Sequence, residues 1–219
     1  MLDKNNSNKN VSLKYIDKSG NTVEYASFRS QEFSKDVFED KKDVMETAVS
    51  IILGKSEQKG RIIILNGQSG TGKSTFLKQL LSEVTERDEK IVLYYLSYDQ
   101  LSNINDEKFQ ETLRQKNGKR KVLIIEDCQK DISQNCFILN STDGLLSETY
   151  DLTYVFTTTK GDEISFRENR LGLSINFGRI PQIKAQEIAV KKNPKFNKTK
   201  IRGSMTILEI MKEVEKEND

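Results

Sequence analysis

Gly67-Gln68-Ser69-Gly70-Thr71-Gly72-Lys73-Ser74 is a complete G-x-x-x-x-G-K-S segment, and the rest of the chain is interpreted outward from it. The apolar run 62–65 precedes the segment, and a helix-forming run follows it from Thr75. This order of strand, loop and helix is what a phosphate-binding loop needs, because its glycines let successive N–H groups point at an anion beside a helix N-terminus. The predicted nucleotide-binding residues are Gly67, Gln68, Ser69, Gly70, Thr71, Gly72, Lys73, Ser74 and Thr75.

Two side chains of this segment carry specific chemistry. In phosphate loops of this pattern the lysine contacts the β- and γ-phosphates, and the following hydroxyl ligates Mg²⁺. The pattern therefore predicts that Lys73 binds the phosphates and that Ser74 binds the metal. ATP and Mg²⁺ are the expected ligands.

A second motif is the run Val122-Leu123-Ile124-Ile125-Glu126-Asp127, four apolar residues followed by two carboxylates. Downstream of a phosphate loop, such a strand end places one acid near Mg²⁺ and another near the attacking water. Two adjacent acids favour hydrolysis over nucleotide sensing. A third polar point is Thr157-Thr158-Thr159, where a hydroxyl is expected to meet the γ-phosphate or the water, although threonines are also ordinary strand residues.

Composition restricts the alternatives. The 219 residues carry 35 basic and 33 acidic side chains, and a net charge of +2 gives no argument for a nucleic-acid or membrane partner. The absence of histidine excludes histidine acid–base catalysis and the usual zinc sites. Cys128 and Cys136 form no disulfide framework and are expected to be buried thiols. No apolar run approaches the roughly 20 residues of a membrane span, so we expect a soluble cytoplasmic protein.

Apolar runs alternating with helical patterns predict an α/β fold, a three-layer sandwich around a five-stranded parallel sheet. The expected strands are 61–66, 91–96, 121–126, 152–158 and 171–177. The expected helices are 36–53, with Ser34 or Asp36 as its cap, 106–116, 137–146, 182–191 and 204–216. We expect four parts: a disordered tail 1–10, a hairpin and helix 11–60, the ATPase core 61–180, and a reduced helical subdomain 181–219.

With these elements in order, the chain resembles an AAA+ ATPase. More narrowly, it is similar to the branch that contains the mitochondrial AAA chaperone translocating the Rieske iron–sulfur protein. The resemblance covers roughly residues 33–180 and rests on four further segments. These are Glu126-Asp127, Leu139-Asn140-Ser141-Thr142-Asp143-Gly144, Tyr154-Val155-Phe156-Thr157-Thr158-Thr159 and Arg167-Glu168-Asn169-Arg170.

The resemblance implies roles for five catalytic residues. Glu126 would serve Mg²⁺ together with Ser74, and Asp127 would serve the attacking water. Thr159 would occupy the sensor position, where the branch has asparagine. Arg167 and Arg170 would be arginine fingers that reach a neighbouring subunit, with Glu168-Asn169 in place of the branch's Pro-Gly. The alternative is that both are solvated surface arginines.

The function implied is an ATP hydrolase working as a homo-oligomeric ring, a hexamer or heptamer, that remodels or translocates a macromolecule, protein being favoured over nucleic acid. ATP is preferred to GTP by the same resemblance, and no N-K-x-D motif is found. Three alternatives stay open: a DNA-associated AAA+ ATPase, a small phosphate-loop kinase, and a non-catalytic nucleotide-gated scaffold. The DNA alternative depends on the basic segment 191–202, in which Phe196 would stack on bases, although a solvated connector explains that segment as well.

Overall fold

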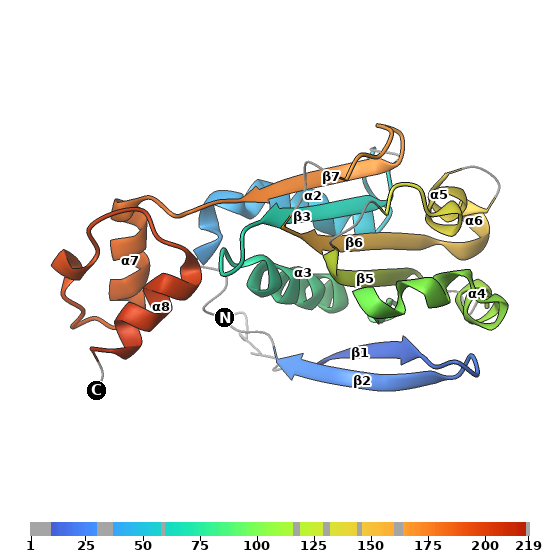
Figure 1. Ribbon diagram of the computed structural model, residues 1–219, viewed down its shortest axis with the longest axis horizontal. Helices are drawn as coiled ribbons and strands as arrows, with labels where there is room; N and C mark the ends of the chain where they lie inside the picture. The colour runs from blue at the N-terminus through green and yellow to red at the C-terminus, as the bar shows by residue number, and fades with distance from the viewer. Residues whose placement is uncertain are drawn as a thin grey trace, which may run out of the picture.

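The structure is a computed structural model that describes residues 10–29, 37–57, 60–115, 119–128, 132–143, 146–159 and 164–217. Residues 1–9 of the predicted tail, and both predicted helix caps, lie outside these ranges. The core of the molecule is one seven-stranded sheet in the order β2-β1-β4-β5-β6-β3-β7 (Figure 1). Its strands are β1 (Asn10–Ile16), β2 (Thr22–Arg29), β3 (Ile62–Gly67), β4 (Val92–Ser97), β5 (Lys121–Cys128), β6 (Leu152–Thr158) and β7 (Leu171–Phe177).

The five strands from β3 to β7 pair in parallel and begin within one residue of their predicted positions. The side chains of β3, β5 and β6 are mostly apolar on both faces, as a sheet covered on two sides requires, whereas β7 at the edge exposes Ser174 and Asn176. In β3, Ile62 and Ile64 join one hydrophobic cluster, whereas Ile63 and Leu65 join the other. All seven residues of β6 are buried, so this strand lies at the centre of the core.

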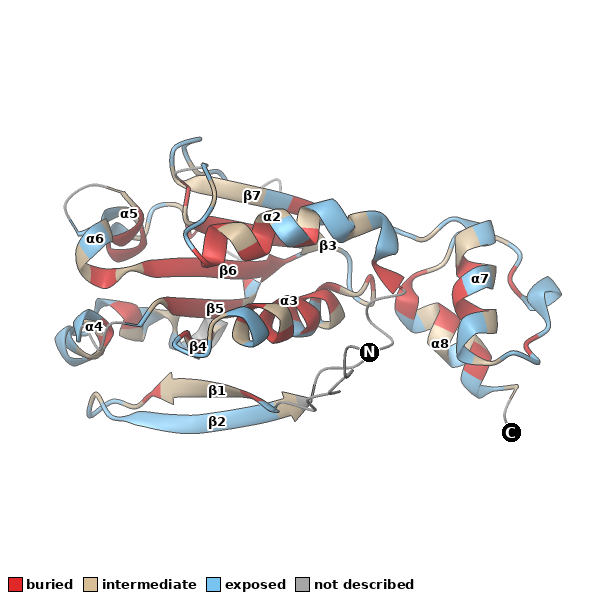
Figure 2. Ribbon diagram, turned by 180° about the vertical axis from the view of Figure 1, so that it is seen from behind, coloured by how far each residue is buried: buried red, intermediate tan, exposed pale blue. Residues whose placement is uncertain are grey.

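Helices cover both faces, which makes the predicted three layers. The α-helices are α2 (Lys42–Ile52), α3 (Lys73–Arg87), α4 (Glu107–Arg114), α5 (Cys136–Thr142), α6 (Ser147–Tyr150), α7 (Gln182–Lys192) and α8 (Ile207–Glu215). The 3-10 helices are η1 (Glu39–Lys41), η2 (Tyr98–Asn105) and η4 (Lys198–Lys200). The helices α2 and α3 share a core with one face of the sheet, and α4 and α5 with the other (Figure 2).

The predicted five-stranded sheet is wrong in its strand number, because the N-terminal hairpin is part of the sheet. β1 lies beside β4 in parallel, with Lys14 opposite Tyr94, and pairs with β2 in an antiparallel arrangement. Asp17 stabilises the hairpin turn by accepting hydrogen bonds from the N–H groups of Ser19 and Asn21, each at 2.8 Å. A pairing between segments so distant in sequence leaves no local signal, so it could not be predicted from the hairpin alone.

One expectation about helices also needs correction, and one helix was missed. The helix predicted over 137–146 ends at Thr142, and α6 is a separate short helix, since Asp143 adopts an extended backbone. The eight-residue helix η2 was not predicted.

The C-terminal segment forms α7, η4 and α8, which lie beyond one end of the sheet (Figure 1). Phe196 is buried in the core, so the idea that it stacks on bases is wrong. The four-part division of the chain remains a prediction. Among the described residues, no helix has the length and apolar character needed to cross a membrane.

Candidate nucleotide site

The phosphate loop depends on three glycines for its shape. Gly70 and Gly72 have φ values of 77° and 100°, a left-handed conformation that side chains disfavour. Gly67 approaches the end of β7 so closely that an added Cβ would lie 2.3 Å from the carbonyl oxygen of Phe177. The sequence motif therefore corresponds to steric requirements of this backbone, and α3 begins within the motif, at Lys73.

Lys73 is buried at the centre of the loop. Its ammonium donates hydrogen bonds to the carbonyl oxygens of Gly67, at 2.6 Å, and Gln68, at 3.0 Å. Burial lowers the pKa of Lys73, and the nearby carboxylates of Asp127 and Glu126 act in the opposite direction. The loop thus holds one positive charge where the motif predicts phosphate oxygens.

A β-bulge in β5 lies at the two adjacent acidic residues, Glu126 and Asp127, and changes the directions in which their side chains point. Ile125 lies opposite Phe156 and Cys128 opposite Thr158, so two residues of β5 face a single residue of β6. Asp127 takes up the extra length with a φ of 54°. In a regular strand, neighbouring side chains point to opposite faces, and a bulge changes that alternation.

The threonine run at the end of β6 fixes the bulge. The hydroxyl of Thr157 accepts a hydrogen bond from the backbone N–H of Asp127 at 2.9 Å. The hydroxyl of Thr158 donates to the carbonyl oxygen of Cys128 at 2.7 Å. Thr159 is exposed and lines the candidate site, so it is the threonine of the three that borders the nucleotide cavity.

Glu126 reaches the phosphate loop, because its Oε1 accepts a hydrogen bond from the Ser74 hydroxyl at 3.1 Å. Burial raises the pKa of Glu126, the Ser74 bond lowers it, and the charge of Asp127 raises it again. A hydroxyl and a carboxylate side by side are oxygen donors of the kind Mg²⁺ prefers. Within the described ranges no group of three or more His, Cys, Asp or Glu side chains gathers.

Most of the predicted site residues border one cavity of about 400 Å³ at the carboxyl ends of the strands, but Glu126 and the loop residues Gly67, Gln68 and Thr71 are not among those that line it. It is lined by Ser69, Gly70, Gly72, Lys73, Ser74, Thr75, Asp127, Thr159, Ile207, Leu208 and Met211. The structure therefore brings the loop, one acid of β5 and the end of β6 together. The three residues from α8 were missed; the apolar pattern of that helix was visible in the sequence, but what it covers was not.

Arg167 and Arg170 lie elsewhere. They precede β7, whose first residue Leu171 pairs with the start of β3, whereas Phe177 pairs with Gly67 at its end. A seven-residue strand spans roughly 20 Å. Both arginines therefore lie near the amino ends of the strands, and the phosphate loop lies at the carboxyl ends. Neither side chain can reach the nucleotide site of its own chain.

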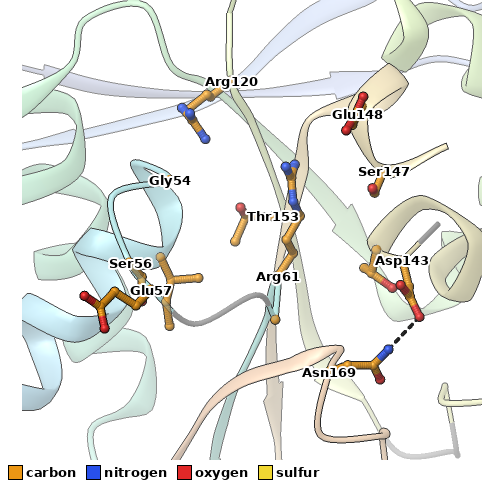
Figure 3. A pocket seen from close by; sticks show the side chains of 13 residues that line it. Gly54, Ser56, Glu57, Arg61, Arg120, Asp143, Ser147, Glu148, Thr153 and Asn169 are labelled. Atoms are coloured by element: carbon orange, nitrogen blue, oxygen red, sulfur yellow. Dashed lines mark hydrogen bonds between the residues drawn. The ribbon is translucent and has the colours of Figure 1, made fainter. Parts of the chain in front are cut away.

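A larger cavity, of about 550 Å³, lies near the amino ends of the strands (Figure 3). Arg61 and Arg120 border it, and both pair with Asp151, at 2.8 and 3.6 Å. Asp143 and Asn169 form another part of its wall. It contains none of the predicted phosphate-binding residues, so it is distinct from the candidate nucleotide site.

A mostly parallel sheet with a glycine-rich loop, a buried lysine, and a hydroxyl–carboxylate pair near the carboxyl ends of its strands defines a P-loop NTPase. The model of the family Novel STAND NTPase 5 matches residues 35–148, just over half of the chain, and the protein therefore belongs to that family. A comparison with curated proteins gave no match.

Two solved structures have a similar fold. A chain of the HORMA:CdnC:Trip13 complex from E. coli MS115-1 is 13% identical with a TM-score of 0.61, and the alignment covers 87% of this chain and 84% of that one. Rhizobiales Trip13 is 15% identical with a TM-score of 0.55, covering 76% of this chain and 71% of that one. At these identities the similarity concerns the fold. The narrower resemblance to the Rieske-translocating branch remains a prediction.

Proposed function

We propose that this P-loop NTPase is a Mg²⁺-dependent ATP hydrolase that works as a homo-oligomer and uses turnover to remodel or translocate a macromolecule, protein rather than nucleic acid. The observation that carries the proposal is the convergence of Lys73, Ser74, Glu126 and Asp127 from two neighbouring segments of the fold. A module that only binds a nucleotide needs the phosphate loop and its lysine. The two carboxylates beside that lysine favour hydrolysis, because one can support Mg²⁺ and the other can orient the attacking water.

Each residue then has a role. Lys73 binds the β- and γ-phosphates, and Ser74 and Glu126 hold Mg²⁺, which when bound neutralises phosphate charge. Asp127 orients the attacking water, and Thr159 contacts that water or the γ-phosphate. The arginines before β7 act on the site of a neighbouring protomer.

The other functions receive less support. A small kinase needs a polar lid and an acceptor pocket, whereas the α8 residues at the cavity are Ile207, Leu208 and Met211. In the basic segment 191–202, Lys195 and Lys198 are exposed and could contact DNA phosphates. Because Phe196 is buried in the core, the segment has no aromatic ring available to stack on bases. Charge reversal at these two lysines should leave any weak DNA binding unchanged.

The test measures ATP turnover and sedimentation with and without Mg²⁺. We expect the parent protein to hydrolyse ATP only with Mg²⁺ and to assemble on a slowly hydrolysed analogue. Lys73→Ala should lose nucleotide binding, and Asp127→Asn should bind ATP but lose turnover by about 10²-fold or more. A protein that remains monomeric with saturating Mg·ATP and hydrolyses it at full rate would contradict the proposal.

A further inference from the structure

The larger cavity, near the amino ends of the strands, is bordered by a buried hydroxyl without a hydrogen-bond partner. Thr153 of β6 is only 5% exposed and lines this cavity (Figure 3). Among the described residues its hydroxyl makes no hydrogen bond, whereas Thr157 and Thr158 of the same strand both bond to β5. Buried polar groups normally have partners, because leaving one unpaired is unfavourable. The Thr153 hydroxyl is therefore available to a molecule in the cavity.

Two arginines reach the same cavity from the residues that precede β3 and β5. Nη1 of Arg61 donates a hydrogen bond to Oδ1 of Asp151 at 2.8 Å, and Nη1 of Arg120 lies 3.6 Å from that same oxygen. Two positive charges thus share one carboxylate. The guanidinium of Arg120 makes no hydrogen bond within the described ranges, so its whole set of N–H donors is free.

The backbone around these arginines has special conformations that permit their arrangement. Asp151 has a φ of 45°, and the other non-glycine residue with a positive φ in the described part of the chain is Asp127, which borders the nucleotide cavity. Gly54, with a φ of 63°, leaves the space in which the Arg120 guanidinium lies, because an added Cβ would collide with that group. Residues in rarely populated conformations are concentrated at functional sites.

The charges around the cavity restrict the ligand. Glu57 and Glu148 also line it, are exposed, and make no ion pair or hydrogen bond among the residues that the structure describes. Asp143 is balanced by Arg170, whose Nε lies 3.7 Å from its Oδ2. With Asp151 included, four carboxylates surround three guanidinium groups, so the cavity has no excess positive charge for a polyphosphate. A ligand that carries both a negative and a positive group matches this pattern.

We infer that this cavity is a binding site for a small zwitterion, a free α-amino acid. Its carboxylate lies between the guanidinium groups of Arg61 and Arg120, whose planar donors match a carboxylate, and accepts a hydrogen bond from Thr153. Its ammonium faces the unpaired carboxylate of Glu148. A volume of about 550 Å³ is ample for such a ligand. The site is separate from the nucleotide cavity, and the inference does not rest on ATP hydrolysis.

The first experiment identifies the ligand on the full chain without nucleotide. Differential scanning fluorimetry with each standard amino acid at millimolar concentration should show a rise in Tm with at least one, and calorimetry should then give a single saturable site. The amine that lacks its carboxylate and the acid that lacks its amino group should each bind about 10-fold more weakly or worse. Inorganic phosphate should not compete.

The second experiment locates the site with variants. Thr153→Val keeps the shape of the side chain and removes the hydroxyl, and Arg120→Gln removes the free guanidinium. Each should lower amino-acid affinity by about 10-fold or more, and Thr153→Val should do so at the parent's Tm or above. Arg202→Gln, which removes an exposed arginine elsewhere, is the matched control and should bind like the parent. Lys73→Ala should also keep amino-acid affinity while losing nucleotide.

The outcomes test this site apart from the proposed function. The inference is overturned if no amino acid binds, if Thr153→Val and Arg120→Gln bind like the parent, or if phosphate or the acid alone binds equally well. It is also overturned if Lys73→Ala loses the amino acid, since the ligand would then occupy the phosphate loop. A parent that binds the amino acid but never hydrolyses ATP supports the inference and contradicts only the proposed function.

Discussion

Asp127 combines an unusual backbone conformation with a charge at the candidate site. Its φ of 54° is tolerated by Asp and Asn but is unfavourable by about 1–2 kcal/mol for most other residues. Its carboxylate borders the nucleotide cavity. The contribution of Asp127 to folding stability can therefore be measured separately from its contribution to turnover, by comparing substitutions that do and do not tolerate this backbone conformation.

We expect Asp127→Asn to leave the free energy of unfolding nearly unchanged, because asparagine accepts the same backbone conformation. Asp127→Ala should lower it by about 1–2 kcal/mol relative to Asp127→Asn. Urea unfolding of the two variants measures the difference. Equal stabilities would mean that the bulge holds its shape without help from the side chain at 127.

The two cysteines differ, which corrects the expectation that both are buried. Burial, with the nearby charge of Asp127, raises the pKa of the Cys128 thiol to about 12. Cys136, at the first position of α5, is exposed. Because the thiolate is the reactive form, the folded protein at pH 8 should react with a thiol reagent at Cys136 only.

Unfolding in denaturant should release the second thiol, and Cys136→Ser should abolish the reaction of the folded chain. A thiol count with Ellman's reagent, before and after unfolding, measures both. Rapid reaction of Cys128 in the folded Cys136→Ser protein would show that β5 opens readily.

At the scale of elements, the hairpin is joined to the parallel sheet by backbone pairing and by aromatic contact. Tyr25 of β2 stacks on Tyr95 of β4, with centroids 4.8 Å apart and an interplanar angle of 7°. Tyr15 of β1 meets Tyr25 edge-on at 6.2 Å. The hairpin therefore contacts β4 in two ways: the backbone of β1 pairs with β4, and a side chain of β2 stacks on a side chain of β4.

We expect a double-mutant cycle between Tyr25→Ala and Tyr95→Ala to give a coupling energy of about 0.5–1.5 kcal/mol, the usual value for aromatic pairs. Chemical denaturation of the parent, both single variants and the double variant supplies the four free energies. A coupling energy indistinguishable from zero would mean that backbone pairing alone holds the hairpin.

The α8 helix contacts the phosphate loop directly. The backbone N–H of Leu208 donates to the carbonyl oxygen of Gly70 at 3.1 Å, and Ile207 packs against Gly72. Thr206 caps the helix by accepting from the N–H of Glu209, whose carboxylate accepts in turn from the N–H of Thr206. The position of the C-terminal segment is thereby linked to the loop expected to bind phosphate.

At the scale of the whole molecule, a ligand that binds only the folded state raises its stability by mass action. At 100 times its dissociation constant the gain is about 2.7 kcal/mol, and in a domain of this size each kcal/mol raises Tm by about 2–4 °C. Mg·ATP should therefore raise the Tm of the parent by about 5–10 °C.

Removing Mg²⁺ with a chelator should reduce this increase, and Lys73→Ala should abolish it. Differential scanning fluorimetry of both proteins, with and without nucleotide, measures the effect. A shift that persists in Lys73→Ala would place the nucleotide outside the phosphate loop.

Much of the fold and of the site was predictable because its signals are local. The motif from Gly67 to Ser74 encodes a backbone that only glycines allow, and apolar runs such as 122–125 mark strands covered on both faces. Strand order, the attachment of the hairpin to β4 and the bulge at Asp127 involve residues far apart in sequence, and a pattern along one segment does not contain them.

The sequence by itself determined that this protein binds phosphate and where its parallel strands begin, since steric demands and apolar periodicity act over a few residues. Only the tertiary structure decided that the hydroxyls of Thr157 and Thr158 hold the bulge of β5, while Thr159, which the resemblance already assigned to the sensor position, borders the cavity. It also decided that Arg170 is neutralised by Asp143 while Arg167 is exposed. The physical reason is that a side chain's partners depend on which distant segments pack against it, and identical residues two positions apart can meet entirely different neighbours.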